Sequence, residues 1–214
     1  MSKRKMKTSK WVFFSAFLML GMMSFSWLQQ GCTGNYPPIA AFVPPPFTAT
    51  PTPTPFNNTY NFENNTAQGW TATGGNIPGV VMTLAAPGDI TPLYCLNLYA
   101  PFTANNTSAG IVHTFPSIDL TGGGIQCEMW IDAGTVVGGF PGGQIFPSDG
   151  TNVSYSYYAN LTQGAWTALS LSFPTSIYGG VNMSKVTSII IQAATGGSGT
   201  VIPGNVKIDD IHIY

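Results

Sequence analysis

The chain has 214 residues, of which 7% are charged and 13% are aromatic, and its formal net charge at pH 7 is −1. That total hides an asymmetry, because five of the seven basic residues lie within the first ten positions. From residue 32 onward, two lysines stand against eight acidic residues, which leaves a net charge of −6. Such a chain has no basic patch with which to neutralise phosphates, which argues against nucleic-acid binding. It also offers little for general acid–base catalysis, since it contains two histidines and few paired carboxylates.

The N-terminal segment 1–32 has the pattern of an export signal. Residues 1–10 are basic and residues 11–28 carry no charge, so the cations stay in the cytoplasm while the apolar run enters the bilayer. The Gly31-Cys32 pair that follows resembles the lipobox of bacterial lipoproteins, which implies acylation of Cys32. Gln29 and Gln30 depart from that pattern, and an uncleaved membrane anchor is the alternative. Both interpretations predict an exported protein, held in the cell envelope by its N-terminus or secreted.

Residues 33–56 form a predicted linker. The segment is rich in proline and ends in alternating Pro and Thr. Proline fixes φ and lacks the amide proton, so we expect an extended spacer with no packed core. The remaining residues, 57–214, have the length of one domain.

The cysteine count bears on whether Cys32 carries lipid. Three cysteines are an odd number for an exported protein. If Cys32 carries lipid, Cys95 and Cys127 remain as one possible disulfide in an oxidising compartment. Two separate buried thiols are the alternative.

The domain has the pattern of an all-β protein. Helical periodicity is absent, and short runs rich in Val, Ile, Tyr, Phe and Thr recur between turn signals. We predict strands at 59–63, 79–84, 93–99, 110–115, 124–131, 143–147, 153–158, 166–173, 186–193 and 205–214. The glycine-rich segments 121–124, 138–143 and 195–199 are expected to form tight connections between antiparallel strands. This spacing is typical of a β-sandwich or barrel.

Alternation along the strands predicts which side chains face the core. Odd-numbered positions are expected to be buried on 125–131, as are positions 169, 171 and 173 and positions 189 and 191. The opposite face of 124–132 carries Gln126, Glu128, Trp130 and Asp132. The outward face is therefore polar and aromatic.

Several segments of the domain resemble the jelly-roll carbohydrate-binding modules of the galactose-binding-like superfamily. They are the opening FENNTAQGW, the middle IQCEMWIDAG and QGAWTALSLSF, and the closing VKIDDIHIY. The resemblance implies a jelly-roll β-sandwich over 57–214 and packing roles for Trp70 and Trp166. It also implies a structural Ca²⁺ held by an acid of the first strand and an acid of the last, with backbone carbonyls. The matching positions are Glu63 and Asp209, with Asp210 as neighbour, and carboxylates suit this ion.

A sugar site needs a flat aromatic face that stacks on a pyranose, flanked by amides or carboxylates that bind its hydroxyls. Trp130 with Gln126 and Glu128 supplies such a set on one strand. Gln144, Phe146 and Gln192 are predicted to extend it from neighbouring strands, and Tyr157, Tyr158 and His113 are weaker candidates. Aromatic residues on an exposed sheet face can equally pair with each other and bind nothing.

We therefore predict a non-catalytic, surface-tethered module that binds polysaccharide. The alternative is a structural or adhesive envelope protein that uses the sandwich for protein contacts. An enzyme is disfavoured, because Glu128 and Asp132 lie about 13 Å apart along one strand at about 3.3 Å per residue. Glycosidases hold their two carboxyl groups within about 10 Å of each other.

Overall fold

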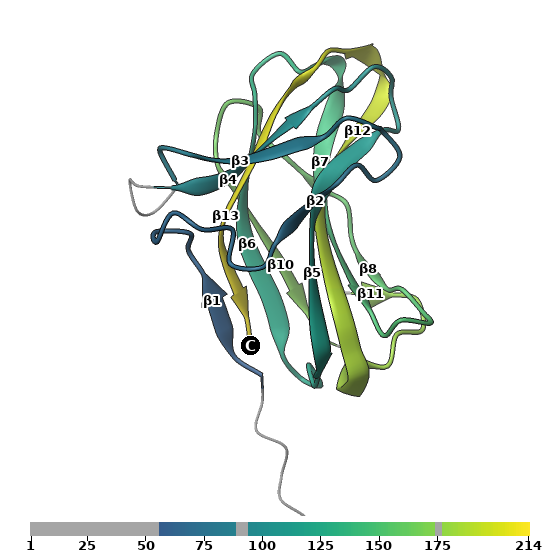
Figure 1. Cartoon of the computed structure of the whole chain (residues 1–214). Coiled ribbons are helices and arrows are strands. Elements are labelled where there is room, and N and C mark those ends of the chain that lie inside the picture. The colour runs from purple at the N-terminus through teal and green to yellow at the C-terminus, as the bar shows by residue number, and fades with distance from the viewer. Residues whose placement is uncertain (1–55, 89–93, 174–176) are drawn as a thin grey trace, which may run out of the picture. The chain divides into compact units, whose positions relative to one another are not determined.

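A computed structural model describes residues 56–88, 94–173 and 177–214, all within one compact unit that spans Thr50–Tyr214. The predictions that concern the signal or anchor 1–32, the lipidation of Cys32 and the linker up to residue 55 lie outside the described residues. The described part is all-β, which confirms the predicted fold class, with two antiparallel sheets packed as a sandwich (Figure 1).

The first sheet, called sheet A here, contains both the first and the last strand. Its strand order is β10-β6-β13-β4-β3, with β1 paired to β13 beside the C-terminus (Figure 1). The strands are β1 (Asn58–Tyr60), β3 (Val81–Ala85), β4 (Cys95–Ala100), β6 (Gly124–Ile131), β10 (Thr167–Ser172) and β13 (Gly204–Ile213).

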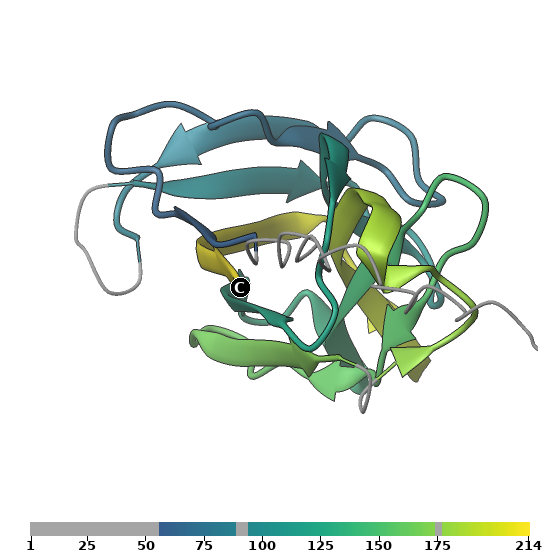
Figure 2. The same cartoon turned by 90° about the horizontal axis from the view of Figure 1, so that it is seen from below.

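The second sheet, called sheet B, has the order β2-β5-β12-β7-β9. Its strands are β2 (Thr71–Thr73), β5 (Ser108–Ile118), β7 (Val136–Ser148), β9 (Ala159–Asn160) and β12 (Val186–Val201). A separate two-stranded ladder joins β8 (Tyr155–Ser156) to β11 (Ile177–Tyr178), and a 3-10 turn, η1 (Met183–Lys185), precedes β12. Figure 2 shows the sandwich from below. Within the described ranges, no helix has the length and apolar character needed to cross a membrane.

The core lies between the sheets, as the alternation predicted. Ile125, Cys127, Met129 and Ile131 of β6 are all buried, and so are the predicted inward positions 169, 171, 173, 189 and 191. Trp70 is 1% exposed, which agrees with its expected packing role. The outward faces of both sheets therefore carry the residues available for binding.

Two glycine-rich segments differ from their predicted role as turns. Residues 138–143 lie inside β7 and residues 195–199 lie inside β12, and the two segments pair with each other, Phe140 opposite Gly196. A Cβ on Gly139 would lie 2.4 Å from the Gly196 carbonyl oxygen, and one on Gly196 would lie 2.8 Å from the Phe140 ring. The glycines thus permit close approach within a long ribbon rather than a reversal of the chain. Segment 121–124 does form the predicted turn before β6.

Of the two alternatives for Cys95 and Cys127, the structure shows two separate buried thiols and no disulfide between them. The reason is the strand order: Cys95 lies on β4 and Cys127 on β6, and β13 separates these strands. Two strand spacings amount to about 9.5 Å, whereas bridged cysteines have Cα atoms at most about 7 Å apart. Burial raises the pKa of the Cys95 thiol to about 11 and also raises that of Cys127.

Candidate functional site

The six predicted sugar-binding residues fall on two different faces of the sandwich. Gln126, Glu128 and Trp130 lie on β6 in sheet A, whereas Gln144, Phe146 and Gln192 lie on β7 and β12 in sheet B. The outer surfaces of a sandwich point in opposite directions, so one ligand cannot contact both sets. The prediction that these strands are neighbours is wrong, because the chain crosses from one sheet to the other between β6 and β7.

The ring of Trp130 is already in contact with its own protein. The side chain is half-buried, and the Trp166 ring meets it edge to face at a centroid distance of 6.0 Å. The Lys207 ammonium lies over the Trp130 ring, 5.5 Å from its centroid, in a cation–π arrangement. A sugar would have to displace these neighbours before it could stack there.

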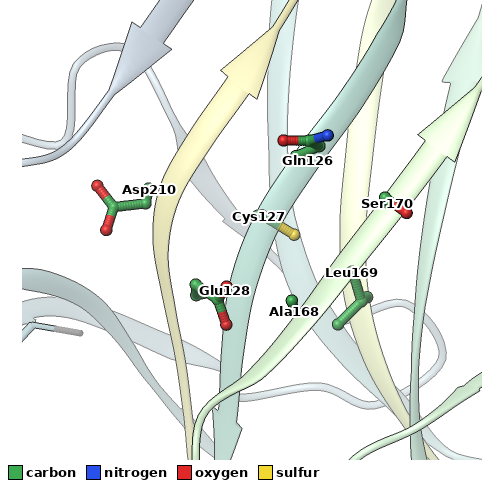
Figure 3. Close-up of a pocket in the computed structure, with 7 residues that line it drawn as sticks. All are labelled: Gln126, Cys127, Glu128, Ala168, Leu169, Ser170 and Asp210. Atoms are coloured by element: carbon green, nitrogen blue, oxygen red, sulfur yellow. The ribbon is translucent and has the colours of Figure 1, made fainter. Parts of the chain in front are cut away.

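Sheet A carries a pocket of about 370 Å³ that is lined by residues of β6 and β10 and by Asp210 of β13. Figure 3 shows Gln126 and Glu128 on β6 beside Ala168 and Ser170 on β10, with Asp210 on β13. The Gln126 amide donates to the Tyr214 hydroxyl at 3.4 Å. With two carboxylates in its lining, this pocket is acidic.

The predicted calcium ligands lie where β1 meets β13. Asp209 is fully buried, and its Oδ1 accepts a hydrogen bond from the Asp210 amide at 2.9 Å. Asp210 has φ of +46° at a bulge that shifts the pairing of β13 with β6. Glu63 follows β1 by three residues, and β1 ends opposite Ile211.

These carboxylates supply only part of a calcium shell. Across residues 56–88, 94–173 and 177–214, no group of three or more His, Cys, Asp or Glu side chains is placed to hold a metal ion. Carboxylate oxygens suit Ca²⁺, which takes six to eight oxygen ligands. A calcium ion here would therefore depend on backbone carbonyls for most of its coordination.

The outer face of sheet B has a different chemical character. Gln192 on β12 lies opposite Gly110 of β5 on one side and opposite Gln144 of β7 on the other. Beside it is a pocket of about 280 Å³ whose lining contains no Asp, Glu, Lys, Arg or His. The lining residues are Asn106, Ser108, Phe140, Tyr158, Gln192, Ala194, Thr195, Gly196 and Gly197. We call this pocket, together with Gln144, the sheet B groove.

Two aromatic rings form one wall of the sheet B groove, and both rest on glycine. Tyr158 lies against Gly142, where an added Cβ would be 1.8 Å from the ring, and its hydroxyl donates to the Ala194 carbonyl at 2.7 Å. Burial raises the pKa of Tyr158 to about 12. Phe140 covers Gly196 and meets the Tyr158 ring edge to face at 5.8 Å. The wall is thus held in place by backbone contacts that only glycine allows.

The three weaker candidates for sugar binding, Tyr157, Tyr158 and His113, also lie in different environments. Tyr158 belongs to the groove wall, whereas His113 packs among the rings of Tyr60, Trp70 and Phe115. Tyr157 is 63% exposed. The prediction omitted Phe140, because the surrounding glycines and proline have the composition of a turn. Its ring contacts depend on the pairing of β7 with β12, which local sequence does not reveal.

Comparisons with known proteins support the fold. No family model and no curated protein matches the sequence. A solved structure of promiscuous carbohydrate-binding modules from the β-sandwich superfamily has a TM-score of 0.53 and 18% identity, covering 72% of this chain and 60% of that one. A second similar structure is the family 11 carbohydrate-binding module from Clostridium thermocellum in complex with a β-1,3-1,4-mixed-linked tetrasaccharide. It has a TM-score of 0.51 and 12% sequence identity, and the match covers 75% of this chain and 96% of that one.

An exo-β-agarase is also similar, with a TM-score of 0.51 and 13% identity, and the match covers 72% of this chain and 25% of the agarase. The chain therefore spans less than two thirds of the length of the β-sandwich superfamily structure and a quarter of the length of the agarase. The predicted resemblance to jelly-roll carbohydrate-binding modules is confirmed at the level of fold. At these identities the likeness extends to architecture and not to ligand.

Proposed function

We propose that the protein is a non-catalytic module that binds an uncharged polysaccharide in the sheet B groove. The observation that carries this proposal is the combination of adjacent amides and an aromatic wall around an uncharged pocket of about 280 Å³. The fold shared with carbohydrate-binding modules supports it. This location replaces the predicted site centred on Trp130, whose ring already contacts Trp166 and Lys207.

The amides suit sugar hydroxyls, which both donate and accept hydrogen bonds. The Gln144 amide nitrogen donates to the Ser156 carbonyl at 3.3 Å, which orients that side chain. Gln192 makes no hydrogen bond through its side chain to another described residue, so its donor and acceptor are both available to a ligand. Phe140 and Tyr158 offer apolar ring surface for the C–H face of a sugar.

The groove lacks the groups that glycoside hydrolysis needs. Hydrolases of this kind use a pair of carboxyl groups that flank the scissile bond. None of the residues that line the sheet B groove has a carboxyl, imidazole or thiol group. Binding without turnover is the function that this chemistry supports.

The tether is a further part of the proposal, and its support is the sequence alone. Lipid on Cys32, or an uncleaved anchor within 1–32, would hold the domain at the cell envelope through the Pro/Thr-rich linker 33–56. Metabolic labelling with a radioactive fatty acid should mark the wild-type protein and not Cys32→Ala. Equal labelling of both proteins, or of neither, would reject lipidation.

The proposal also includes a structural calcium ion held by Glu63, Asp209 and backbone carbonyls, with Asp210 as neighbour. Its support is the chemistry of the donor set, because carboxylate and backbone carbonyl oxygens suit Ca²⁺ and two carboxylates, the fully buried Asp209 and its neighbour Asp210, lie together here. An ion present at about 100 times its Kd would stabilise the fold by about 2.7 kcal/mol. A chelator should then lower Tm by about 5 °C or more, and an unchanged Tm would reject the site.

A glycan screen tests the proposed function directly. The wild-type protein should retain one or more neutral polysaccharides on affinity gels, and Gln192→Ala should weaken that retention. Trp130→Ala serves as the control from the opposite face and should bind like wild type. Absence of binding to every neutral glycan would reject the function, and loss of binding only in Trp130→Ala would move the site to sheet A.

A further inference from the structure

A second aromatic pair lies on the outer face of sheet B, at the far side of the amides from Phe140 and Tyr158. The rings of Phe146 and Tyr155 are 6.4 Å apart with an interplanar angle of 40°. Phe146 projects outward because its neighbours Ile145 and Pro147 on β7 are buried. Tyr155 is 43% exposed and Phe146 is partly buried, so both rings contribute to the surface of the domain.

The two pairs and the amides follow one line along β7. Phe140, Gln144 and Phe146 share the outward face, since side chains alternate along a strand. The pairing of β7 with β12 is unbroken from Phe140 opposite Gly196 to Phe146 opposite Ile190. Six residues of antiparallel strand separate the two phenylalanines by about 20 Å at about 3.4 Å per residue. That span exceeds the length of a disaccharide.

No charge interrupts this line. The residues of β12 that face outward between the pairs are Ile190, Gln192 and Ala194, which alternate with the buried Ile191 and Ala193. β7 and β12 lie side by side over the whole distance (Figure 1). The surface therefore offers ring, amide and ring in succession, which matches a repeating neutral chain better than a single sugar.

We infer that the ligand is an extended, uncharged glycan chain that lies along β7 and β12 and contacts both aromatic pairs. Phe146 and Tyr155 form a second subsite that makes the protein selective for chains over short sugars. This inference rests on the proposed function and adds its direction and its length requirement. Phe140 and Tyr158 hold one part of the chain, Gln144 and Gln192 bind hydroxyls at the centre, and the second subsite holds the other part.

The test compares oligosaccharides of defined length from mixed-linked β-1,3-1,4-glucan by isothermal titration calorimetry. The wild-type protein should bind an octasaccharide at least about tenfold more tightly than a disaccharide, a difference of about 1.4 kcal/mol. Tyr155→Ala should weaken octasaccharide binding by about tenfold and leave disaccharide binding within about twofold. Tyr99→Ala is a matched control, because Tyr99 is 47% exposed and lies on β4 of sheet A.

The outcomes separate this inference from the proposed function. Equal affinity for the octasaccharide and the disaccharide, or an octasaccharide affinity unchanged by Tyr155→Ala, would overturn the inference while the glycan-binding function stands. If the wild-type protein binds neither this glucan nor any other neutral glycan in the screen, the function and the inference both fail. An effect of Tyr99→Ala equal to that of Tyr155→Ala would also overturn the inference, because it would place the chain elsewhere.

Discussion

Replacement of Gly142 by alanine should dismantle the wall of the sheet B groove while the sandwich remains folded. A Cβ at this position would lie 1.8 Å from Cε1 and 2.1 Å from Cζ of Tyr158. These atoms are at the far end of a side chain that can rotate, so the ring should swing away before the backbone moves. The groove would then lose Tyr158 and the support that Tyr158 gives to Phe140.

The magnitude follows from the contacts that Tyr158 makes. Its hydrogen bond to the Ala194 carbonyl, 2.7 Å long, contributes about 1 kcal/mol. Its edge-to-face contact with Phe140 contributes about 0.5–1.5 kcal/mol. Gly142→Ala should therefore lower the free energy of unfolding by about 2 kcal/mol.

The pH dependence gives a second readout of the same side chain. Burial raises the pKa of Tyr158 from 10.0 to about 12. The stability that comes from its protonated form is complete below pH 10 and is lost as the pH rises toward 12. Because the side chain is half-exposed, that loss is of the order of 1 kcal/mol. Gly142→Ala should abolish it.

Urea denaturation at pH 7 and at alkaline pH measures both effects. Gly180→Ala is the matched control, since nothing lies within 4 Å of a Cβ at Gly180, and its stability should stay within about 0.5 kcal/mol of wild type. Equal stability of Gly142→Ala and wild type, with an unchanged alkaline titration of Tyr158, would refute this account of the wall.

Three further predictions concern other parts of the domain. Cys95 and Cys127 should resist thiol reagents at pH 8 in the native protein and react after unfolding, because burial raises both pKa values; rapid native labelling or a disulfide by mass spectrometry would contradict this. Asp149→Asn should destabilise the protein at pH 7, because the amides of Asn152, Asn182 and Thr151 hold the pKa of this carboxyl well below its usual range. That stability is present above about pH 4 and lost as the pH falls toward the lowered pKa, so thermal denaturation curves of variant and wild type should converge in acid; a constant difference would contradict the assignment. Glycan affinity should be the same at low and high salt, since the groove is uncharged, and a steep fall with salt in titration calorimetry would place the ligand on a charged face.

Much of the fold could be predicted because the alternation of apolar and polar residues along a strand indicates which side chains are buried. The pattern over 124–131 gives both the bounds of β6 and its buried face, and 205–214 nearly matches β13. A segment of two or three residues is too short to show the alternation of apolar and polar residues, so the sequence does not predict the shortest strands. These are Thr71–Thr73, Ala159–Asn160 and Ile177–Tyr178. Residues 138–143 have the composition of a turn, and their pairing with β12 depends on residues about 55 positions away.

The site was harder to predict because alternation shows which residues face outward and not which sheet they belong to. Trp130 and Gln192 both face outward, but they lie on opposite faces of the sandwich. The contacts of Trp130 with Lys207 and of Tyr158 with Gly142 join strands or segments that are distant in sequence. Such contacts determine which aromatic ring is accessible to a ligand, and they cannot be predicted from the amino-acid composition.

The central claim is that the ligand binds sheet B rather than sheet A. A nuclear magnetic resonance titration with mixed-linked β-1,3-1,4-glucan oligosaccharides can observe both faces of the sandwich in one sample. We expect progressive shifts of the Gln144 and Gln192 side-chain amides and of the Gly110 and Gly196 backbone amides, with the Trp130 and Trp166 indole signals unmoved. Shifts confined to the indoles and to the amides of β6 would contradict this claim.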